Sequence, residues 1–280
     1  MNSYDDILII TDLDGTLIPR GQKISAANKQ AIARFTAGGG KFAIATGRTP
    51  EAAAGYVAGI NINAPSVFFN GSMLFDWENK EILATIPLSD GDNVFPDFAK
   101  VCLEKFPNAC LEVYTADNCH IISNATNDDP RLPFEYYKYA HTDLAELSDT
   151  KKTPWLKFFA NDSHENLAKL EILAAAAGLD NLANSFYSDT NYYEFVAKNV
   201  SKGTMLEKIR ERSEFKNTKI IALGDYLNDN EMLIAADCGI ATANAHKDTK
   251  KAADLVGCAA EENLIVWTLN HMNEIVDFFV

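Results

Sequence analysis

The chain has 280 residues, which is long enough for one large domain or two of ordinary size. Its hydrophobic content of 47% is that of a folded globular protein. The formal net charge of −14 excludes a generally basic surface, so we expect neither nucleic acid nor an anionic membrane as a partner. A small anionic ligand remains compatible with this charge, because a few cations and a metal ion can reverse the sign inside one cleft.

The cysteines point to a reducing compartment. They form no CxxC pair and their number is odd, which favours reduced thiols over a disulfide framework; they are Cys102, Cys110, Cys119, Cys238 and Cys258. The opening residues include Asp5 and Asp6 and only a short apolar run, which does not match a signal peptide. No apolar stretch reaches the length of a membrane span. We therefore expect a cytoplasmic protein.

The first 70 residues alternate between apolar runs and amphipathic segments. The expected order is strand, helix, strand, helix, strand, over residues 7–11, 26–37, 41–45, 50–58 and 66–69. Such alternation is typical of βαβ units and a parallel sheet.

The pattern then changes to hairpins and single helices. Paired strands are expected at 73–75 with 81–86, 111–115 with 120–123, and 185–188 with 192–197. Helices are expected at 93–106 and 163–177, and a further strand at 155–160. Hairpins with separate helices predict an α+β unit.

The βα alternation resumes near residue 200, with helices over 202–212, 230–236 and 246–253 and strands over 219–223 and 239–241. The fold class is therefore α/β, with a Rossmann-like parallel-sheet core interrupted by an inserted domain. We assign residues 1–85 and 190–280 to the core and residues 86–189 to the inserted α+β domain.

Two carboxylates follow the first apolar strand, in Asp12-Leu13-Asp14-Gly15-Thr16. Residues at i and i+2 of a strand point to the same side, so like charges would be forced together. Such a pair persists when a cation sits on it or when the two carboxylates have different tasks. The pattern indicates one nucleophilic and one proton-transferring carboxylate at the strand end where α/β sheets place their ligands.

Three further motifs follow in order: Thr46-Gly47-Arg48, Ser201-Lys202-Gly203, and Gly224-Asp225 with Asn228-Asp229. Together with the Asp12 motif they resemble the haloacid dehalogenase superfamily over essentially the whole chain. The inserted domain resembles the C2-type cap of the Cof-like sugar phosphatase group, subclass IIB. The resemblance implies that the core performs the chemistry and that the cap selects the leaving group.

The resemblance also implies roles for the acidic residues. Asp12 is expected to attack phosphorus and to form an aspartyl-phosphate, and Asp14 to act as general acid and base. Mg²⁺ is the expected cofactor, held by the side chains of Asp12 and Asp225 and by the backbone carbonyl of Asp14. Asp229 is expected either to ligate the ion directly or to orient water molecules that are bound to it, and the sequence leaves both open.

The remaining site residues are expected to bind substrate. Thr46, Gly47, Lys202 and Asn228 are the expected phosphate-binding residues. Arg48, Asn70 and Lys157 are weaker candidates for substrate contact; Asn70 belongs to an Asn-Gly turn that lies at the cleft in Cof-like proteins. The aromatic segments 134–139 and 155–159 either stack on the substrate or form the core of the inserted domain.

The resulting prediction is a Mg²⁺-dependent phosphoric monoester hydrolase acting on a small phosphorylated metabolite, with a sugar phosphate favoured. The alternatives are a phosphatase of flavin mononucleotide or pyridoxal phosphate, a sugar phosphomutase and, more remotely, a non-enzymatic sensor of a phosphorylated ligand. The expected oligomeric state is a monomer or a weak homodimer.

Overall fold

The computed structural model describes residues 4–123 and 139–279 of the chain. It divides into two compact units, the first formed by Met1–Ala84 with Ser201–Val280 and the second by Thr85–Val200. The inserted domain was expected to end at residue 189. The structure instead places residues 190–200 in the second unit, because the strand Tyr192–Ala197 pairs with two other strands of that unit.

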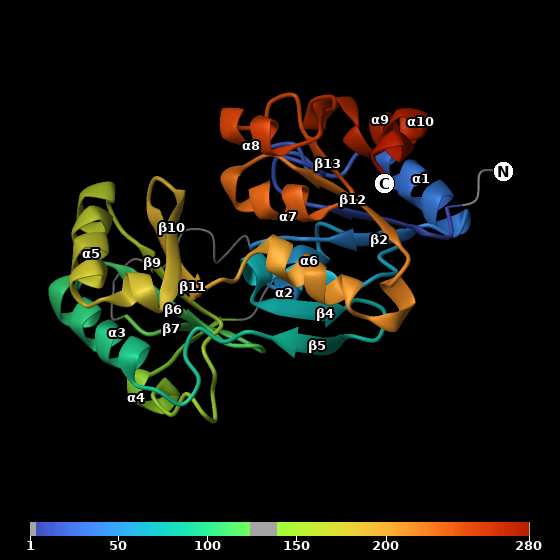
Figure 1. Cartoon of the computed structure of the whole chain (residues 1–280). Helices are drawn as coiled ribbons and strands as arrows, with labels where there is room; N and C mark the ends of the chain where they lie inside the picture. Colours follow the sequence, from blue (N-terminus) through green and yellow to red (C-terminus); the bar gives the residue numbers. More distant parts are fainter. Residues whose placement is uncertain (1–3, 124–138, 280) are drawn as a thin grey trace. The chain divides into compact units, whose positions relative to one another are not determined.

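The first unit is built on a parallel sheet with the strand order β14-β13-β12-β1-β2. Its strands are β1 (Ile7–Thr11), β2 (Lys41–Ile44), β12 (Lys219–Gly224), β13 (Cys238–Ala241) and β14 (Leu255–Val256). Its helices are α1 (Ala26–Ala37), α2 (Pro50–Ala54), α6 (Lys202–Arg210), α7 (Asn230–Ala235), α8 (Lys247–Ala252), α9 (Leu264–Asn270) and α10 (Met272–Ile275). Figure 1 shows α1, α9 and α10 in one group and α6, α7 and α8 in another.

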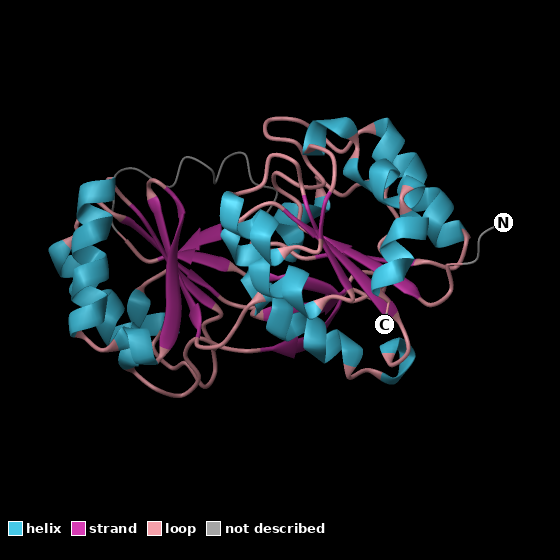
Figure 2. Ribbon diagram, turned by 45° about the horizontal axis from the view of Figure 1, so that its top comes forward, coloured by secondary structure: helices cyan, strands magenta, loops and turns pink. Residues whose placement is uncertain are grey.

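The continuous apolar strands explain this arrangement. Leu8, Ile9 and Ile10 of β1 are fully buried, as are Ile220 and Ile221 of β12. A strand that is buried on both faces needs cover on both sides, which the two groups of helices provide (Figure 2).

The third predicted strand of the core behaves differently from the first two. β3 (Ser66–Phe68) pairs antiparallel with β4 (Met73–Asp76) in a small sheet of order β3-β4-β5, where β5 is Glu81–Thr85. A single parallel bridge, Ala45 to Val67, connects β3 to the end of β2. The expected third strand is therefore present and parallel to β2 at this bridge, but most of its pairing is with β4, because the short apolar run turns back at once.

The second unit has the predicted α+β character. Its sheet has the order β10-β11-β9-β6-β7-β8. The strands are β6 (Cys110–Tyr114), β7 (Cys119–Ile121), β8 (Tyr139–His141), β9 (Lys157–Asn161), β10 (Ala183–Asp189) and β11 (Tyr192–Ala197). The helices are α3 (Val94–Lys105), α4 (Leu144–Leu147) and α5 (His164–Ala176), which Figure 1 shows on one side of this sheet.

The core of the second unit is aromatic. Trp155, Phe158 and Phe195 are almost completely buried, and Phe98 of α3 meets Phe158 and Phe195 edge to face. Within the segment 155–159, Trp155 and Phe158 thus serve the core of the unit, one of the two expected roles. In the other expected aromatic segment, residues 134–138 lie outside the described residues.

Candidate active site

The site of the first unit begins at the carboxyl ends of two neighbouring strands. β1 and β12 run parallel with Thr11 beside Leu223, and the backbone N–H of Asp12 donates to the carbonyl of Leu223 at 2.9 Å. Asp12 and Asp225 each follow the end of one of these strands. Because parallel strands end at the same edge, the two carboxylates come together although they are far apart in sequence.

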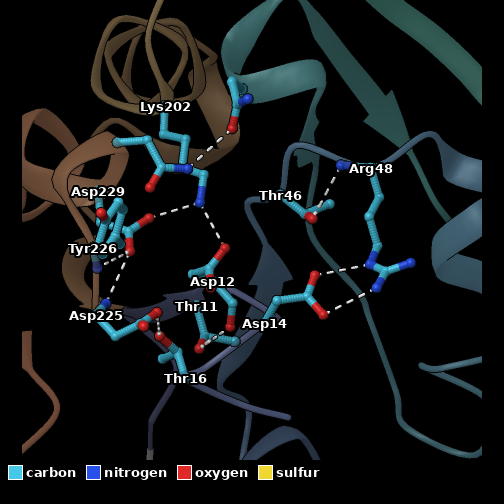
Figure 3. Close-up of polar contacts among 12 residues, drawn as sticks. Thr11, Asp12, Asp14, Thr16, Thr46, Arg48, Lys202, Asp225, Tyr226 and Asp229 are labelled. Atoms are coloured by element: carbon cyan, nitrogen blue, oxygen red, sulfur yellow. Dashed lines mark hydrogen bonds and ion pairs between the residues drawn. The ribbon is translucent and has the colours of Figure 1, made fainter. Parts of the chain in front are cut away.

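Lys202 is the cation that joins these carboxylates. It is the first residue of α6, whose N-cap Ser201 forms a capping box with Thr204. Its side chain is fully buried, and Nζ donates to Oδ1 of Asp12 and to Oδ1 of Asp229, both at 2.6 Å (Figure 3). Burial alone would lower the pKa of Lys202, but the charges of Asp12 and Asp229 outweigh it and raise the pKa, so the ammonium stays charged.

Asp229 is occupied on both of its oxygens. Oδ1 accepts from Lys202, and Oδ2 accepts the backbone N–H groups of Asp225 at 2.9 Å and Tyr226 at 3.1 Å. Asp229 therefore fixes the backbone that carries Asp225. Thr16, which was not among the predicted site residues, donates from its hydroxyl to Oδ1 of Asp225 at 2.8 Å. Its place in the same motif as Asp12 was the available signal.

The three carboxylates suit a hard divalent cation. Asp12, Asp225 and Asp229 each offer an oxygen, and these oxygens lie within 4.8 Å of one another. All three residues are buried, and Lys202 forms ion pairs with two of them, Asp12 and Asp229. Burial and the neighbouring carboxylates raise the pKa of Asp12 well above its usual value, against the effect of Lys202, and raise the pKa of Asp225 to about 6. A buried group of oxygen ligands with more negative than positive charge fits a divalent metal ion.

Asp14 lies in a different environment from Asp12. Its side chain is 50% exposed, and both of its oxygens are bound by Arg48, with Nε to Oδ2 at 2.8 Å and Nη2 to Oδ1 at 3.0 Å (Figure 3). The guanidinium also lies 4.3 Å from the ring centroid of Tyr56. The expected acid/base residue is therefore held by a fork–fork ion pair.

The second expected binding loop follows β2. Thr46 is buried, and its hydroxyl accepts the backbone N–H of Arg48 at 3.2 Å, which shapes the loop 46–48. A side chain at Gly47 would place its Cβ 2.9 Å from Nδ2 of Asn70. Asn70 in turn accepts from Nδ2 of Asn228 at 3.1 Å. The structure thus brings the loop, Asn70 and Asn228 together.

Lys157 is the one predicted site residue that lies elsewhere. It belongs to β9 of the second unit, where its buried ammonium pairs with Glu194 at 3.2 Å and lies 4.3 Å from the ring centroid of Tyr114. Its role in substrate selection stays a prediction.

Comparison with known proteins identifies the family. A family model described as haloacid dehalogenase-like hydrolase matches residues 9–269, so the chain belongs to this family. It is 25% identical to pyridoxal phosphate phosphatase YbhA of Escherichia coli (strain K12), over 89% of this chain and 92% of that protein.

Solved structures show the same fold. A haloacid dehalogenase-like hydrolase from Bacteroides thetaiotaomicron matches with a TM-score of 0.81 at 23% identity, over 95% of this chain and 99% of that one. A haloacid dehalogenase subclass IIB sugar phosphatase matches with a TM-score of 0.76 at 20% identity, over 95% of this chain and 99% of that one. The predicted fold class and family are thereby confirmed.

Proposed function

We propose that the chain is a Mg²⁺-dependent phosphatase that hydrolyses a small phosphorylated metabolite, with a sugar phosphate as the favoured substrate class. The observation that carries the proposal is the buried cluster in which Lys202 joins Asp12 and Asp229 beside Asp225. Family membership and the similarity to a named phosphatase support the reaction type.

The residues of the first unit can divide the reaction between them. An oxygen of Asp12 forms a bond to phosphorus while the bond from phosphorus to the leaving oxygen breaks, and protonated Asp14 gives its proton to that oxygen. A water molecule then attacks the phosphorus, Asp14 takes its proton, and the bond between Asp12 and phosphorus breaks to release inorganic phosphate. Lys202 stabilises the anionic oxygens throughout.

Asp12 and Asp225 would hold Mg²⁺ with their side chains, and Asp14 with its backbone carbonyl. When bound, the ion supplies positive charge that offsets the repulsion between a carboxylate and a phosphate. Both oxygens of Asp229 already have partners in the protein, which supports a role in positioning Lys202 and the backbone of Asp225.

A phosphate-release screen tests the proposal. Sugar phosphates, nucleotides, flavin mononucleotide and pyridoxal phosphate would each be assayed with Mg²⁺ and with EDTA. We expect Mg²⁺-dependent release that disappears in Asp12→Asn while circular dichroism shows an intact fold. Isomer formation without phosphate release would identify a mutase instead, and binding without any turnover would identify a sensor. Pyridoxal phosphate as the preferred substrate is the alternative supported by the similarity to YbhA.

Metal binding distinguishes the roles proposed for Asp14 and Asp225. We predict that Asp14→Asn lowers turnover by about 10²–10⁴-fold, because proton transfer is lost, while Mg²⁺ affinity stays within about twofold of wild type. Asp225→Asn should lose Mg²⁺ affinity by more than about tenfold, because it removes a side-chain ligand. Calorimetric titration with Mg²⁺ measures both. Equal loss of affinity in the two variants would contradict the assignment.

Two further features belong to the proposal. A cytoplasmic location is supported by the cysteines, which are free thiols, four of them buried. Within the described residues no helix combines the length and the apolar composition of a membrane span. The proposed oligomeric state is a monomer or a weak homodimer, which sedimentation at several concentrations would test.

A further inference from the structure

The turn between β3 and β4 has an unusual backbone. Phe69, Asn70 and Gly71 have φ values of 51°, 55° and 116°. Gly accepts positive φ without cost, but Phe and Asn in this region are strained, by roughly 1–3 kcal/mol each. Phe69 is also almost fully buried. Such strain persists only where the surroundings hold it in place.

The strained turn is bonded to the loop 46–48. The backbone N–H of Phe69 donates to the carbonyl of Arg48 at 3.2 Å, and that of Asn70 donates to the carbonyl of Thr46 at 3.0 Å. The side chain of Asn70 lies against Gly47, where an added Cβ would approach its amide at 2.9 Å. The turn therefore fixes the expected phosphate-binding loop.

The same turn also meets the two other motifs. A Cβ on Gly71 would overlap the carbonyl of Ser201, the residue before Lys202, so the bare backbone of Gly71 packs on the start of α6. Asn228 is exposed, whereas Asn70 is 7% exposed and accepts from its amide at 3.1 Å. A buried, rigid acceptor thus orients a side chain that would otherwise sample several rotamers.

We propose that Asn70 is a positioning residue, which orients the Asn228 amide toward the transferring phosphoryl group, and that the strained backbone of residues 69 and 70 is the cost of this placement. The inference rests on the proposed phosphatase function and adds a role for a side chain that does not itself react. One amide hydrogen of Asn228 is held by Asn70, which leaves the other to donate to a phosphoryl oxygen.

Asn70→Gly tests this, because it relieves the backbone strain, keeps both backbone bonds to the loop and removes only the side chain. A purely structural role predicts unchanged or higher stability with unchanged turnover. A positioning role likewise predicts unchanged or higher stability, but together with a fall of about 10–100-fold in kcat, since small misplacements of a binding group have effects of this size. Urea unfolding and steady-state kinetics give the two readouts.

A double-mutant cycle supplies the specific readout. Asn228→Ala should show a similar fall in kcat, and Asn70→Gly added to it should change kcat by less than about threefold, because the two side chains act as one unit. Lys80→Gly is the matched control: Lys80 is exposed, has φ 59° and lies in the β4–β5 turn, and its replacement should leave kcat unchanged.

The outcomes separate the two proposals. If the wild type is active, two results overturn the inference alone. One is a kcat of Asn70→Gly within about twofold of wild type, and the other is a double variant in which the effects of the two substitutions on kcat simply multiply. A wild type that releases no phosphate from any substrate overturns the proposed function and the inference together. If Asn70→Gly fails to fold, Asn228→Ala decides, because it leaves the turn intact: turnover within about twofold of wild type overturns the inference.

Discussion

Arg48 gives Asp14 a fixed orientation although half of that side chain is exposed. A carboxylate that must give and take a proton at one place benefits from such restraint. The stacking of the guanidinium near Tyr56 restrains Arg48 itself. Under the proposed function, proton transfer would require that one oxygen of Asp14 be released to face the leaving group or the water.

Replacing Arg48 should therefore reduce catalysis. We predict that Arg48→Ala lowers kcat/KM by about 10–100-fold, because Asp14 loses its orientation. Arg48→Lys should recover little, since an ammonium cannot bind both oxygens in a fork. Steady-state kinetics on the best substrate measure both, with Arg34→Ala, at an exposed position of α1, as the control expected to match wild type. Full activity of Arg48→Lys would contradict this role.

The positions of the carboxylates could be predicted from the sequence, but the residues that bind their oxygens could not. Asp12 and Asp225 were predictable because each follows an apolar strand, and parallel strands end at one edge. The choice of Arg48 as the partner of both Asp14 oxygens depends on rotamers and on the path of the loop after β2, which no local pattern contains. The hydrogen bonds to both oxygens of Asp229 also depend on rotamers and loop geometry, and the sequence alone did not predict them either.

At the scale of elements, the contact between the 69–71 turn and α6 is a packing constraint that a substitution can test. Gly71→Ala should destabilise the protein by more than about 2 kcal/mol, because it combines a positive φ with a clash against the Ser201 carbonyl. Gly21→Ala is the matched control, since Gly21 has φ 71° and nothing within 4 Å of an added Cβ. It should cost only the backbone term, about 1–2 kcal/mol. Equal losses in urea unfolding would show that the clash is relieved by movement of α6.

Asp237 ties α6 to the sheet and makes its stability pH-dependent. Arg210 donates to Oδ2 at 2.8 Å, as does the backbone N–H of Ile220. Burial alone would raise the pKa of Asp237, but these hydrogen bonds, with Arg210 and Lys219 as charges, lower it. A lowered pKa in the folded state stabilises the protein above the unfolded value of about 3.9, and this contribution is lost as the pH falls through the folded value.

We predict that Asp237→Asn lowers the free energy of unfolding by about 1–3 kcal/mol at pH 7. The difference from wild type should stay constant down to about pH 5 and shrink below about pH 4, where Asp237 of the unfolded wild type becomes protonated. Urea unfolding at a series of pH values measures it. Asp97→Asn removes an exposed pair with Lys100 and should change stability by less than about 0.5 kcal/mol. A difference that grows toward low pH would refute the assigned sign.

Element types were more predictable than element partners. The helices 26–37 and 164–176 agree with their apolar residues and with the capping serines Ser25 and Ser163, and the helix 94–105 agrees with its apolar residues alone. β3 runs parallel to the end of β2 as expected, but its additional antiparallel pairing with β4 was not predicted, because an apolar run of three residues does not specify its partners. The predicted helix over 50–58 ends at Ala54, ahead of Gly55, because Gly stabilises a helix poorly.

The whole molecule has two cores that belong to different stretches of the chain. We predict that Phe158→Ala destabilises the second unit by about 3–5 kcal/mol and leaves the protection of β1 and β12 unchanged. Hydrogen exchange followed by mass spectrometry should show faster exchange only within residues 85–200. Ile221→Ala, at a fully buried position of β12, should produce the reverse pattern. Faster exchange in both units from either substitution would show that they unfold as one.

The insertion itself was predictable, because the alternation of strands and helices stops and later resumes. Its second boundary was placed at residue 189, inside the hairpin predicted for 185–188 with 192–197, although both strands of a hairpin belong to one unit. The pairing of β11 with β10 was predicted, and its second pairing, with β9, confirms that the whole hairpin belongs to the second unit.

The balance of three carboxylates against one ammonium in the first unit has a thermodynamic consequence. Under the proposed function, a divalent ion and an oxyanion must strengthen each other's binding by the same factor, because linkage is reciprocal. Free orthophosphate and sulfate, abundant competitors in any cell, should then bind poorly whenever the divalent ion is scarce. Inhibition by the product orthophosphate would then depend on the concentration of the divalent ion, and a separate regulatory site would not be needed for this.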